Sequence, residues 1–77
     1  MTTEQQAAAF RVACQHLNLP QSAAAQFFGV DVSTIRRWDQ RGPPYSVMMV
    51  LDYCIARALT PDAFAAAIRR TRKETSL

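Results

Sequence analysis

The chain has 77 residues and a formal net charge of +3, from 9 Lys and Arg against 6 Asp and Glu, and 49% of its residues are hydrophobic. This length makes one domain, residues 1–77, and excludes a separate ligand-sensing module. The longest apolar stretch, residues 47–51, is too short to cross a bilayer, and the N-terminus shows no signal peptide. We therefore expect a cytoplasmic protein with no membrane partner, and the positive charge favours a polyanionic one.

Apolar residues at helical spacing predict a first helix over residues 4–17. Thr3 and Gln6 resemble a capping box at its start, and Asn18 and Pro20 end it. The residues expected on its buried face are Phe10, Ala13, Cys14 and Leu17.

A second helix is predicted over residues 21–28, followed by Gly29 at a tight turn where positive φ is favoured. We expect the Asp31 side chain to cap a third helix, residues 32–41, by accepting from a first-turn backbone N–H. Ile35 and Trp38 should point inward from this helix. Gly42 and Pro43 are a strong stop signal.

The fourth predicted helix starts at Pro44 or Tyr45 and reaches Leu59. It is apolar on nearly every side: one stripe consists of Val47, Leu51, Cys54 and Ala58, and other apolar residues cover the remaining faces. Thr60, Pro61 and Asp62 are typical of the start of a fifth helix. That helix should turn Phe64, Ala67 and Ile68 inward, end near residue 72 in basic residues and leave residues 73–77 as a frayed tail.

Residues 20–42 carry the most informative spacing. Relative to Gln21, a small alanine follows at Ala25, a glycine at Gly29 and apolar residues at Ile35 and Trp38. Two short helices that cross steeply need a small residue at the crossing, a glycine in the turn and apolar contacts from the second helix. The sequence therefore predicts an all-α, compact five-helix domain with a central helix-turn-helix.

The motif QSAAAQFFGVDVSTIRRWDQRG resembles the helix-turn-helix repressors of the phage Cro and CI (XRE-like) class. QSAAAQFFG together with PPYSVMMVLDY is similar to anti-CRISPR-associated (Aca) repressors of phages and mobile elements. The resemblance implies a lambda-repressor-like fold that binds double-stranded DNA without a cofactor. Pro20 departs from the family, which usually has Ser or Thr there to cap the second motif helix.

The resemblance places three residues of the third helix at DNA bases, Val32, Ser33 and Arg37, and puts Arg36 on the flank. We expect all four to read bases. An arginine side chain matches the O6 and N7 acceptors of guanine, and Val32 suits a thymine methyl group. The alternative for both arginines is a pair of solvated charges on an exposed helix face.

Phosphate contacts are expected at the ends of the motif helices and at the start of the fourth helix. The residues are Gln21, Thr34, Gln40, Arg41, Tyr45 and Ser46. Gln21 has the alternative of an ordinary polar residue in a first turn, and Tyr45 that of packing on Pro43 or Pro44.

A homodimer interface is expected on the fourth helix, because one small core cannot bury all its sides. Its residues are Met48, Met49, Tyr53 and Ile55, for which core packing is the alternative. The basic segment of residues 69–73 has two interpretations, a phosphate clamp or cations favoured by the helix dipole.

Metal and enzyme functions are not indicated. His16 is the only histidine, and its side chain on a helix lies about 200° from that of Cys14, so the two cannot share an ion. Cys14 and Cys54 lie in apolar patterns that favour buried thiols over a disulfide. We expect no metal site, no cofactor and no catalysis.

The combined prediction is a sequence-specific transcriptional repressor that binds an inverted-repeat operator as a homodimer, without a small-molecule ligand. The resemblance further implies a nucleoid-associated protein in a bacterial host cell that represses its own anti-CRISPR operon. One alternative is an antitoxin-like or adaptor module that uses the same fold to bind a protein. Another is an accessory protein of DNA packaging or recombination.

Overall fold

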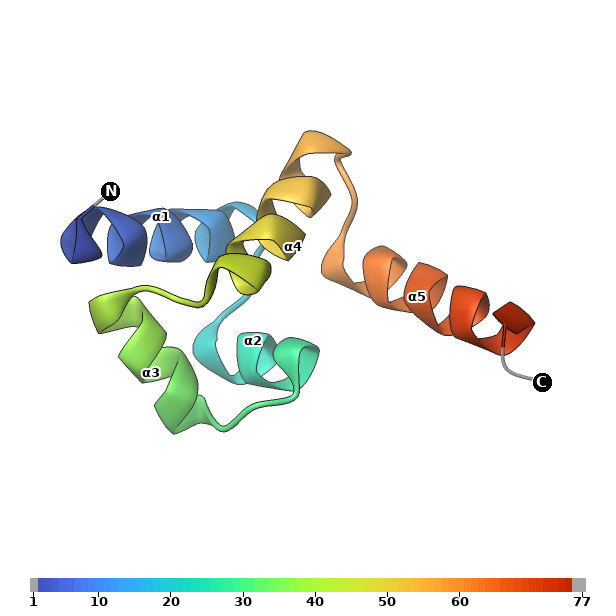
Figure 1. Cartoon of the computed structure of the whole chain (residues 1–77), viewed down its shortest axis with the longest axis horizontal. Coiled ribbons are helices and arrows are strands. Elements are labelled where there is room, and N and C mark those ends of the chain that lie inside the picture. Colours follow the sequence, from blue (N-terminus) through green and yellow to red (C-terminus); the bar gives the residue numbers. More distant parts are fainter. Residues whose placement is uncertain (1, 76–77) are drawn as a thin grey trace.

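The computed structural model describes residues 2–75, and these form five α-helices and no strand. The helices are α1 (Thr3–His16), α2 (Gln21–Phe28), α3 (Val32–Arg41), α4 (Tyr45–Ala56) and α5 (Pro61–Thr75) (Figure 1). The all-α prediction is confirmed for this part of the chain, as are the predicted bounds of α2 and α3. The α1 and α4 helices end earlier than predicted, at His16 and Ala56.

A capping box starts α1, but one residue earlier than the sequence predicted. The hydroxyl of Thr2 accepts from the Gln5 backbone N–H at 3.2 Å, and the Gln5 side chain accepts from the Thr2 N–H at 3.0 Å. The prediction of Thr3 and Gln6 was wrong because the run Thr-Thr-Glu-Gln-Gln offers the same residue types in two registers.

Three helices end through the same left-handed turn. The residues in this conformation are Asn18 (φ 56°) after α1, Gly29 (φ 68°) after α2 and Ala58 (φ 54°) after α4. In each turn the next backbone N–H bonds back into the helix: Leu19 to Cys14 at 2.8 Å, Val30 to Ala25 at 3.0 Å, and Leu59 to Cys54 at 2.8 Å. This Schellman arrangement satisfies carbonyls that the helix end would leave unpaired. Ala58 in this turn is exposed, whereas Leu51 and Cys54 of the same predicted stripe are buried.

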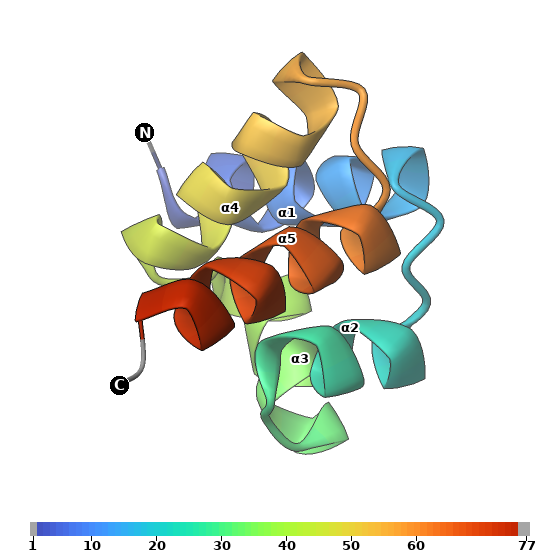
Figure 2. The ribbon, with the colours of Figure 1, turned by 90° about the vertical axis from the view of Figure 1, so that its right-hand side faces the viewer.

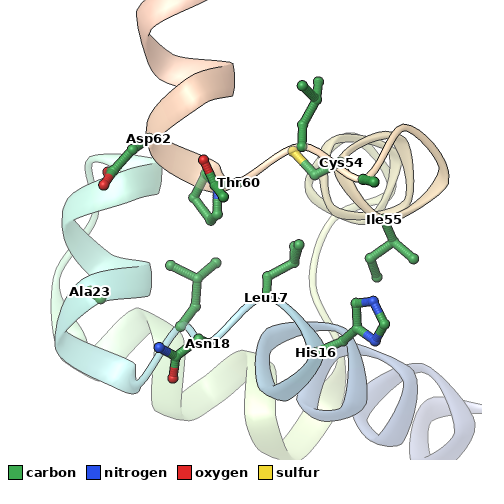
Figure 3. A pocket seen from close by; sticks show the side chains of 12 residues that line it. His16, Leu17, Asn18, Ala23, Cys54, Ile55, Thr60 and Asp62 are labelled. Atoms are coloured by element: carbon green, nitrogen blue, oxygen red, sulfur yellow. The ribbon is translucent and has the colours of Figure 1, made fainter.

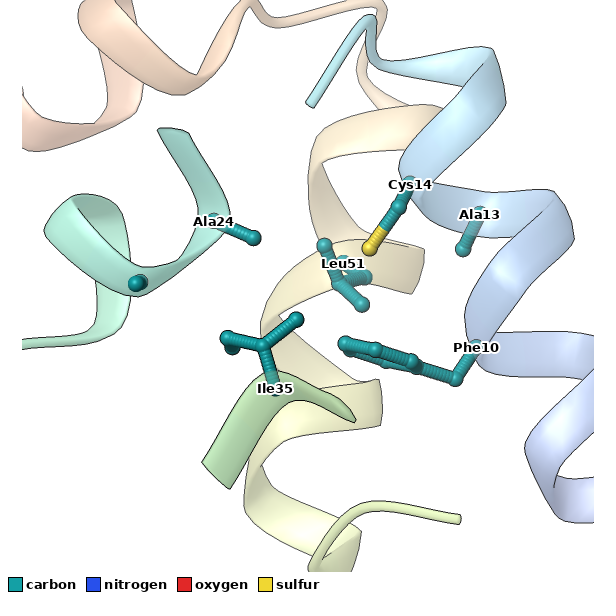
Figure 4. Packing of buried hydrophobic residues seen from close by; sticks show 7 residues of the cluster. Phe10, Ala13, Cys14, Ala24, Ile35 and Leu51 are labelled. Carbon is teal, nitrogen blue, oxygen red and sulfur yellow. The ribbon is translucent and has the colours of Figure 1, made fainter. Parts of the chain in front are cut away.

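The core is built by the first four helices. Its buried cluster consists of Phe10, Ala13 and Cys14 from α1, Ala24 and Ala25 from α2, Ile35 from α3 and Leu51 from α4 (Figure 4). The alanines of α2 leave room for α3 to approach closely. Both cysteines are free and buried, as predicted.

Aromatic rings connect all five helices. The Trp38 ring meets Phe10 edge-on at a centroid distance of 5.8 Å and Phe28 at 6.0 Å. Phe28 is followed in this series by its neighbour Phe27. The Phe27 ring lies 6.1 Å from the ring of Phe64 on α5, and the Phe64 ring lies 6.0 Å from that of Tyr53 on α4. Such edge contacts add about 0.5–1.5 kcal/mol each beyond burial, so Trp38 anchors α3 as the sequence predicted.

The fifth helix lies outside this group and its C-terminal half points away from it (Figures 1 and 2). Its first turn is capped by the Thr60 hydroxyl, which accepts from the Ala63 N–H at 3.1 Å. The radius of gyration is 13.0 Å, whereas a compact chain of this length would have about 11.5 Å. The difference reflects the projecting helix.

Two predictions about α5 were wrong. Ala67 and Ile68 are exposed rather than inward, because only the first half of the helix lies against the body. Residues 73–75 belong to the helix and not to a frayed tail, whereas residues 76–77 lie outside the described part.

Candidate nucleic-acid interface

The face of α3 that points away from the core is polar and cationic. Its residues are Ser33, Arg36, Arg37, Gln40 and Arg41, which line one shallow depression of about 320 Å³ and are all exposed. The other four follow Ser33 by three, four, seven and eight residues, which places all five on one side of the helix. On the opposite side Ile35 is buried and Trp38 is half-buried, so packing fixes which face meets solvent.

The positive charge of this face is not neutralised by the part of the chain that the structure describes. Arg36, Arg37 and Arg41 form no ion pair or side-chain hydrogen bond with any residue that the structure describes. The acid of α3, Asp39, is half-buried and lies off the exposed face. Guanidinium groups in this state bind phosphate or guanine without first breaking an internal pair.

Asp39 instead joins three helices. Its carboxylate accepts from Nε2 of Gln21 at 2.8 Å, which ties the start of α2 to α3. Its backbone carbonyl accepts from Nη1 of Arg11 on α1. A cation near the C-terminal carbonyls of a helix is favourable, so Arg11 helps to orient α3. Neither Arg11 nor Asp39 was predicted from the sequence, because contacts between residues 28 and 18 positions apart leave no local pattern.

The helices next to this face begin without side-chain caps. The N-cap residues of α2, α3 and α4 are Pro20, Asp31 and Pro44. Within the described residues, none of their side chains accepts a hydrogen bond from a first-turn backbone N–H. The prediction that Asp31 caps α3 was therefore wrong, although Asp31 does occupy the cap position. First-turn N–H groups without a partner attract anions.

The predicted phosphate residues lie partly at these helix starts. Gln21 is exposed at the start of α2, and Tyr45 and Ser46 are exposed at the start of α4. The alternative that Tyr45 packs on the neighbouring prolines does not hold, because 81% of its side chain is exposed. Thr34 is half-buried.

Val32 does not join the exposed face. It is half-buried and packs against the core cluster, because it stands one helical turn before Ile35 on the inward side. Of the four predicted base contacts, the structure brings together Ser33, Arg36 and Arg37.

The residues predicted for a dimer interface divide into two pairs. Met48 and Ile55 are half-buried and pack against the core of their own chain, which is the alternative that the sequence left open for them. Met49 and Tyr53 point outward and are 55% and 47% exposed.

A larger cleft, of about 590 Å³, lies where α5 leaves the body (Figure 3). It is lined by the ends of α1 and α4 and the start of α5, with the polar side chains of His16 and Asp62 on opposite sides (Figure 3). Of the predicted site residues, Ile55 alone borders it, so it is separate from the α3 face. Among the described residues no three metal-ligating side chains lie close enough to hold an ion.

In residues 2–75 we find no helical segment with the length and hydropathy that a membrane span requires. Comparison of the chain with protein-family models, with curated proteins and with solved structures gave no match.

Proposed function

We propose that this chain is a helix-turn-helix DNA-binding protein in which α3 enters the major groove of duplex DNA. The observation that carries the proposal is the exposed face of α3. Its three unpaired guanidinium groups (Arg36, Arg37 and Arg41) stand on a helix that the core holds from behind. A major groove admits one α-helix, and its base edges are read by side chains of this kind.

The geometry of the helix pair supports this proposal. Gly29 adopts φ 68° in the turn between α2 and α3, which is the conformation for which glycine is suited. Ala24 and Ala25 are buried at the contact, and Ile35 closes it from α3. These are the features that a lambda-repressor-like motif requires at those positions.

Each exposed residue has a role in the proposal. Ser33, Arg36 and Arg37 read bases, and an arginine bidentate to guanine contributes about 1–3 kcal/mol of discrimination. Phosphates are bound by the remaining polar groups around the face: Gln21, Thr34, Gln40, Arg41, Tyr45 and Ser46. The uncapped starts of α2 and α4 add backbone N–H donors.

We further propose that two copies bind an inverted repeat and act as a repressor by occluding a promoter, with no cofactor. Dimeric helix-turn-helix proteins place their recognition helices about 34 Å apart, one turn of duplex. The resemblance to anti-CRISPR-associated repressors makes the promoter of an anti-CRISPR operon, in a bacterial cytoplasm, the proposed target.

The alternative is a protein-interaction module, antitoxin-like or adaptor, with α4 as the binding surface. The exposed Tyr45, Met49 and Tyr53 favour it. A module that binds through α4 would not require the exposed Arg36 and Arg37 on α3.

A selection from random duplexes with the full chain tests the DNA-binding proposal. We expect enrichment of an inverted repeat with half-site centres about 10 base pairs apart, and protection of that repeat in footprinting. Binding should weaken steeply with salt, because counterions are released from DNA. No enriched sequence, together with salt-insensitive binding, would contradict the proposal.

A further inference from the structure

Asp31 places a carboxylate at the start of the otherwise cationic α3 helix. It is the N-cap residue, with φ -73° and ψ 153°. Its backbone carbonyl accepts from the N–H groups of Thr34 at 3.0 Å and Ile35 at 3.3 Å, and these bonds fix its position relative to the helix. The Asp31 side chain is exposed, so the structure presents an acid beside the arginines of this face.

The Asp31 carboxylate has no partner in the described part of the chain. It accepts no hydrogen bond from the first turn of α3, and it forms no ion pair with the arginines of the same helix. Asp39, the other acid of this region, differs because it accepts from Gln21. The Asp31 carboxylate is therefore available to a binding partner.

The start of α3 is the end of that helix that lies farthest from α1 and α4. In Figures 1 and 2 it lies at the lower end of the molecule, directly after the turn that Gly29 makes. In helix-turn-helix complexes the N-terminal residues of the recognition helix contact the base edges. A carboxylate at this end is therefore brought to the bases when α3 enters the major groove.

The bases offer this carboxylate few partners. A carboxylate only accepts hydrogen bonds, and the phosphates of DNA are anions that repel it. The major groove presents two kinds of donor, the N4 amino group of cytosine and the N6 amino group of adenine. Guanine and thymine present acceptors there, so they are disfavoured opposite Asp31.

Cytosine suits the carboxylate better than adenine does. Adenine carries the N7 acceptor beside its amino group, and this nitrogen repels the second carboxylate oxygen, whereas cytosine presents an amino group alone. Acidic side chains accordingly accept from N4 of cytosine. Arginines select guanine, the partner of cytosine, so Asp31 and its neighbours on α3 favour the same base pair.

We propose that Asp31 is a specificity-determining residue that accepts a hydrogen bond from N4 of one cytosine in each half-site. The inference rests on the proposed function and deepens it, because it names a base of the target that the arginines do not read. Asp31 also repels phosphates from the start of α3, which lowers the affinity of the protein for duplexes without that cytosine.

Selection from random duplexes, with the full chain and two variants, tests the inference. Asparagine binds N6 and N7 of adenine and is as favourable as aspartate at an N-cap. Asp31→Asn should therefore replace one fixed cytosine of the selected half-site by adenine, with a melting temperature close to that of the wild type. Asp62→Asn is the matched control: it removes the same charge from the exposed first turn of α5 and should select the wild-type sequence.

Fluorescence anisotropy measures the size of the effect on two duplexes, the selected one and one in which that cytosine is replaced by adenine. The wild type should prefer the selected duplex about tenfold. Asp31→Ala should bind the two equally well. It should also bind unrelated duplexes more tightly than the wild type does, because one negative charge is removed from the interface.

The outcomes separate this inference from the proposed function. If the wild type selected a sequence that Asp31→Asn and Asp31→Ala left unchanged, the inference alone would be overturned, and Asp31 would be an acid that only complements the helix dipole. If the wild type enriched no sequence, the proposed function would fail and the inference with it.

Discussion

The side-chain amide of Gln21, the first residue of α2, donates a hydrogen bond of 2.8 Å to the carboxylate of Asp39 near the end of α3. Arg11 donates to the backbone carbonyl of the same residue. One acid thus holds α1, α2 and α3 together while its charge stays off the exposed face of α3. The structure therefore gives Gln21 an internal partner as well as a place at the start of α2.

Gln21→Glu should destabilise the fold by roughly 1 kcal/mol, because a carboxylate replaces the donor and faces the carboxylate of Asp39. Urea denaturation measures the effect. Ser22→Glu is the control: Ser22 is exposed in the same first turn, where an acid is favoured by the helix dipole. Equal loss of stability in the two variants would show that the Gln21–Asp39 contact does not matter.

Gly42→Ala should lower the free energy of unfolding more than Gly29→Ala does. Both glycines have positive φ, 91° and 68°. An alanine at Gly29, which is in the left-handed helical region, costs about 1–2 kcal/mol of backbone strain, and one at Gly42, where ψ is 153°, costs about 1–3 kcal/mol in a region that almost only glycine adopts. A Cβ at Gly42 would also lie 2.7 Å from Cβ of Gln6, whereas one at Gly29 would meet nothing within 4 Å. The clash should add about 1–3 kcal/mol, measurable as a lower urea midpoint. A Gly29→Ala variant as unstable as Gly42→Ala would contradict this.

Ala58→Gly should stabilise the protein by about 1 kcal/mol. Ala58 has φ 54° at the end of α4, a conformation that costs an alanine energy and a glycine very little. Ala56→Gly, in the last helical turn, is the control and should instead destabilise. The two melting temperatures should shift in opposite directions, and a lower value for Ala58→Gly would refute the reasoning.

Cys14 should make stability fall at alkaline pH. Burial, and secondarily the Asp39 carboxylate, raise the pKa of Cys14 to about 11, above the value of about 8.5 for an exposed thiol. The neutral thiol thus stabilises the fold below about pH 8.5, and this contribution, on the order of 3 kcal/mol, is lost as pH rises toward 11. Urea unfolding of Cys14→Ala should show a shallower alkaline decline, and parallel curves for the two proteins would disprove the assignment.

Local patterns predicted the helices well, because their signals lie within a few residues. Pro20, Gly29, Gly42 and Pro61 mark helix ends by their own backbone preferences. The left-handed conformation of Ala58 was not predicted, because alanine has no preference for it. Ala58 adopts it in the turn where the Leu59 backbone N–H bonds to the Cys54 carbonyl.

The exposed face of α3 was predicted from the sequence, whereas the covered sides of α4 were not. Periodicity placed Ile35 and Trp38 inward and so placed Arg36 and Arg37 outward, as the structure has them. It did not decide which sides of the apolar α4 helix would be covered, because that depends on where the other helices of the core pack against it. Met48 and Ile55 were therefore assigned to a dimer interface, although they pack against the core of their own chain.

Fluorescence anisotropy with the duplex recovered by selection tests the central claim most directly. Arg37→Ala should weaken binding by about 1–3 kcal/mol and relax the preference for guanine at one position, with an unchanged melting temperature. Arg57→Ala removes the same charge from an exposed position at the C-cap of α4, and we expect it to change affinity little. If Arg37→Ala and Arg57→Ala bound the duplex equally well, α3 would not be the element that reads DNA.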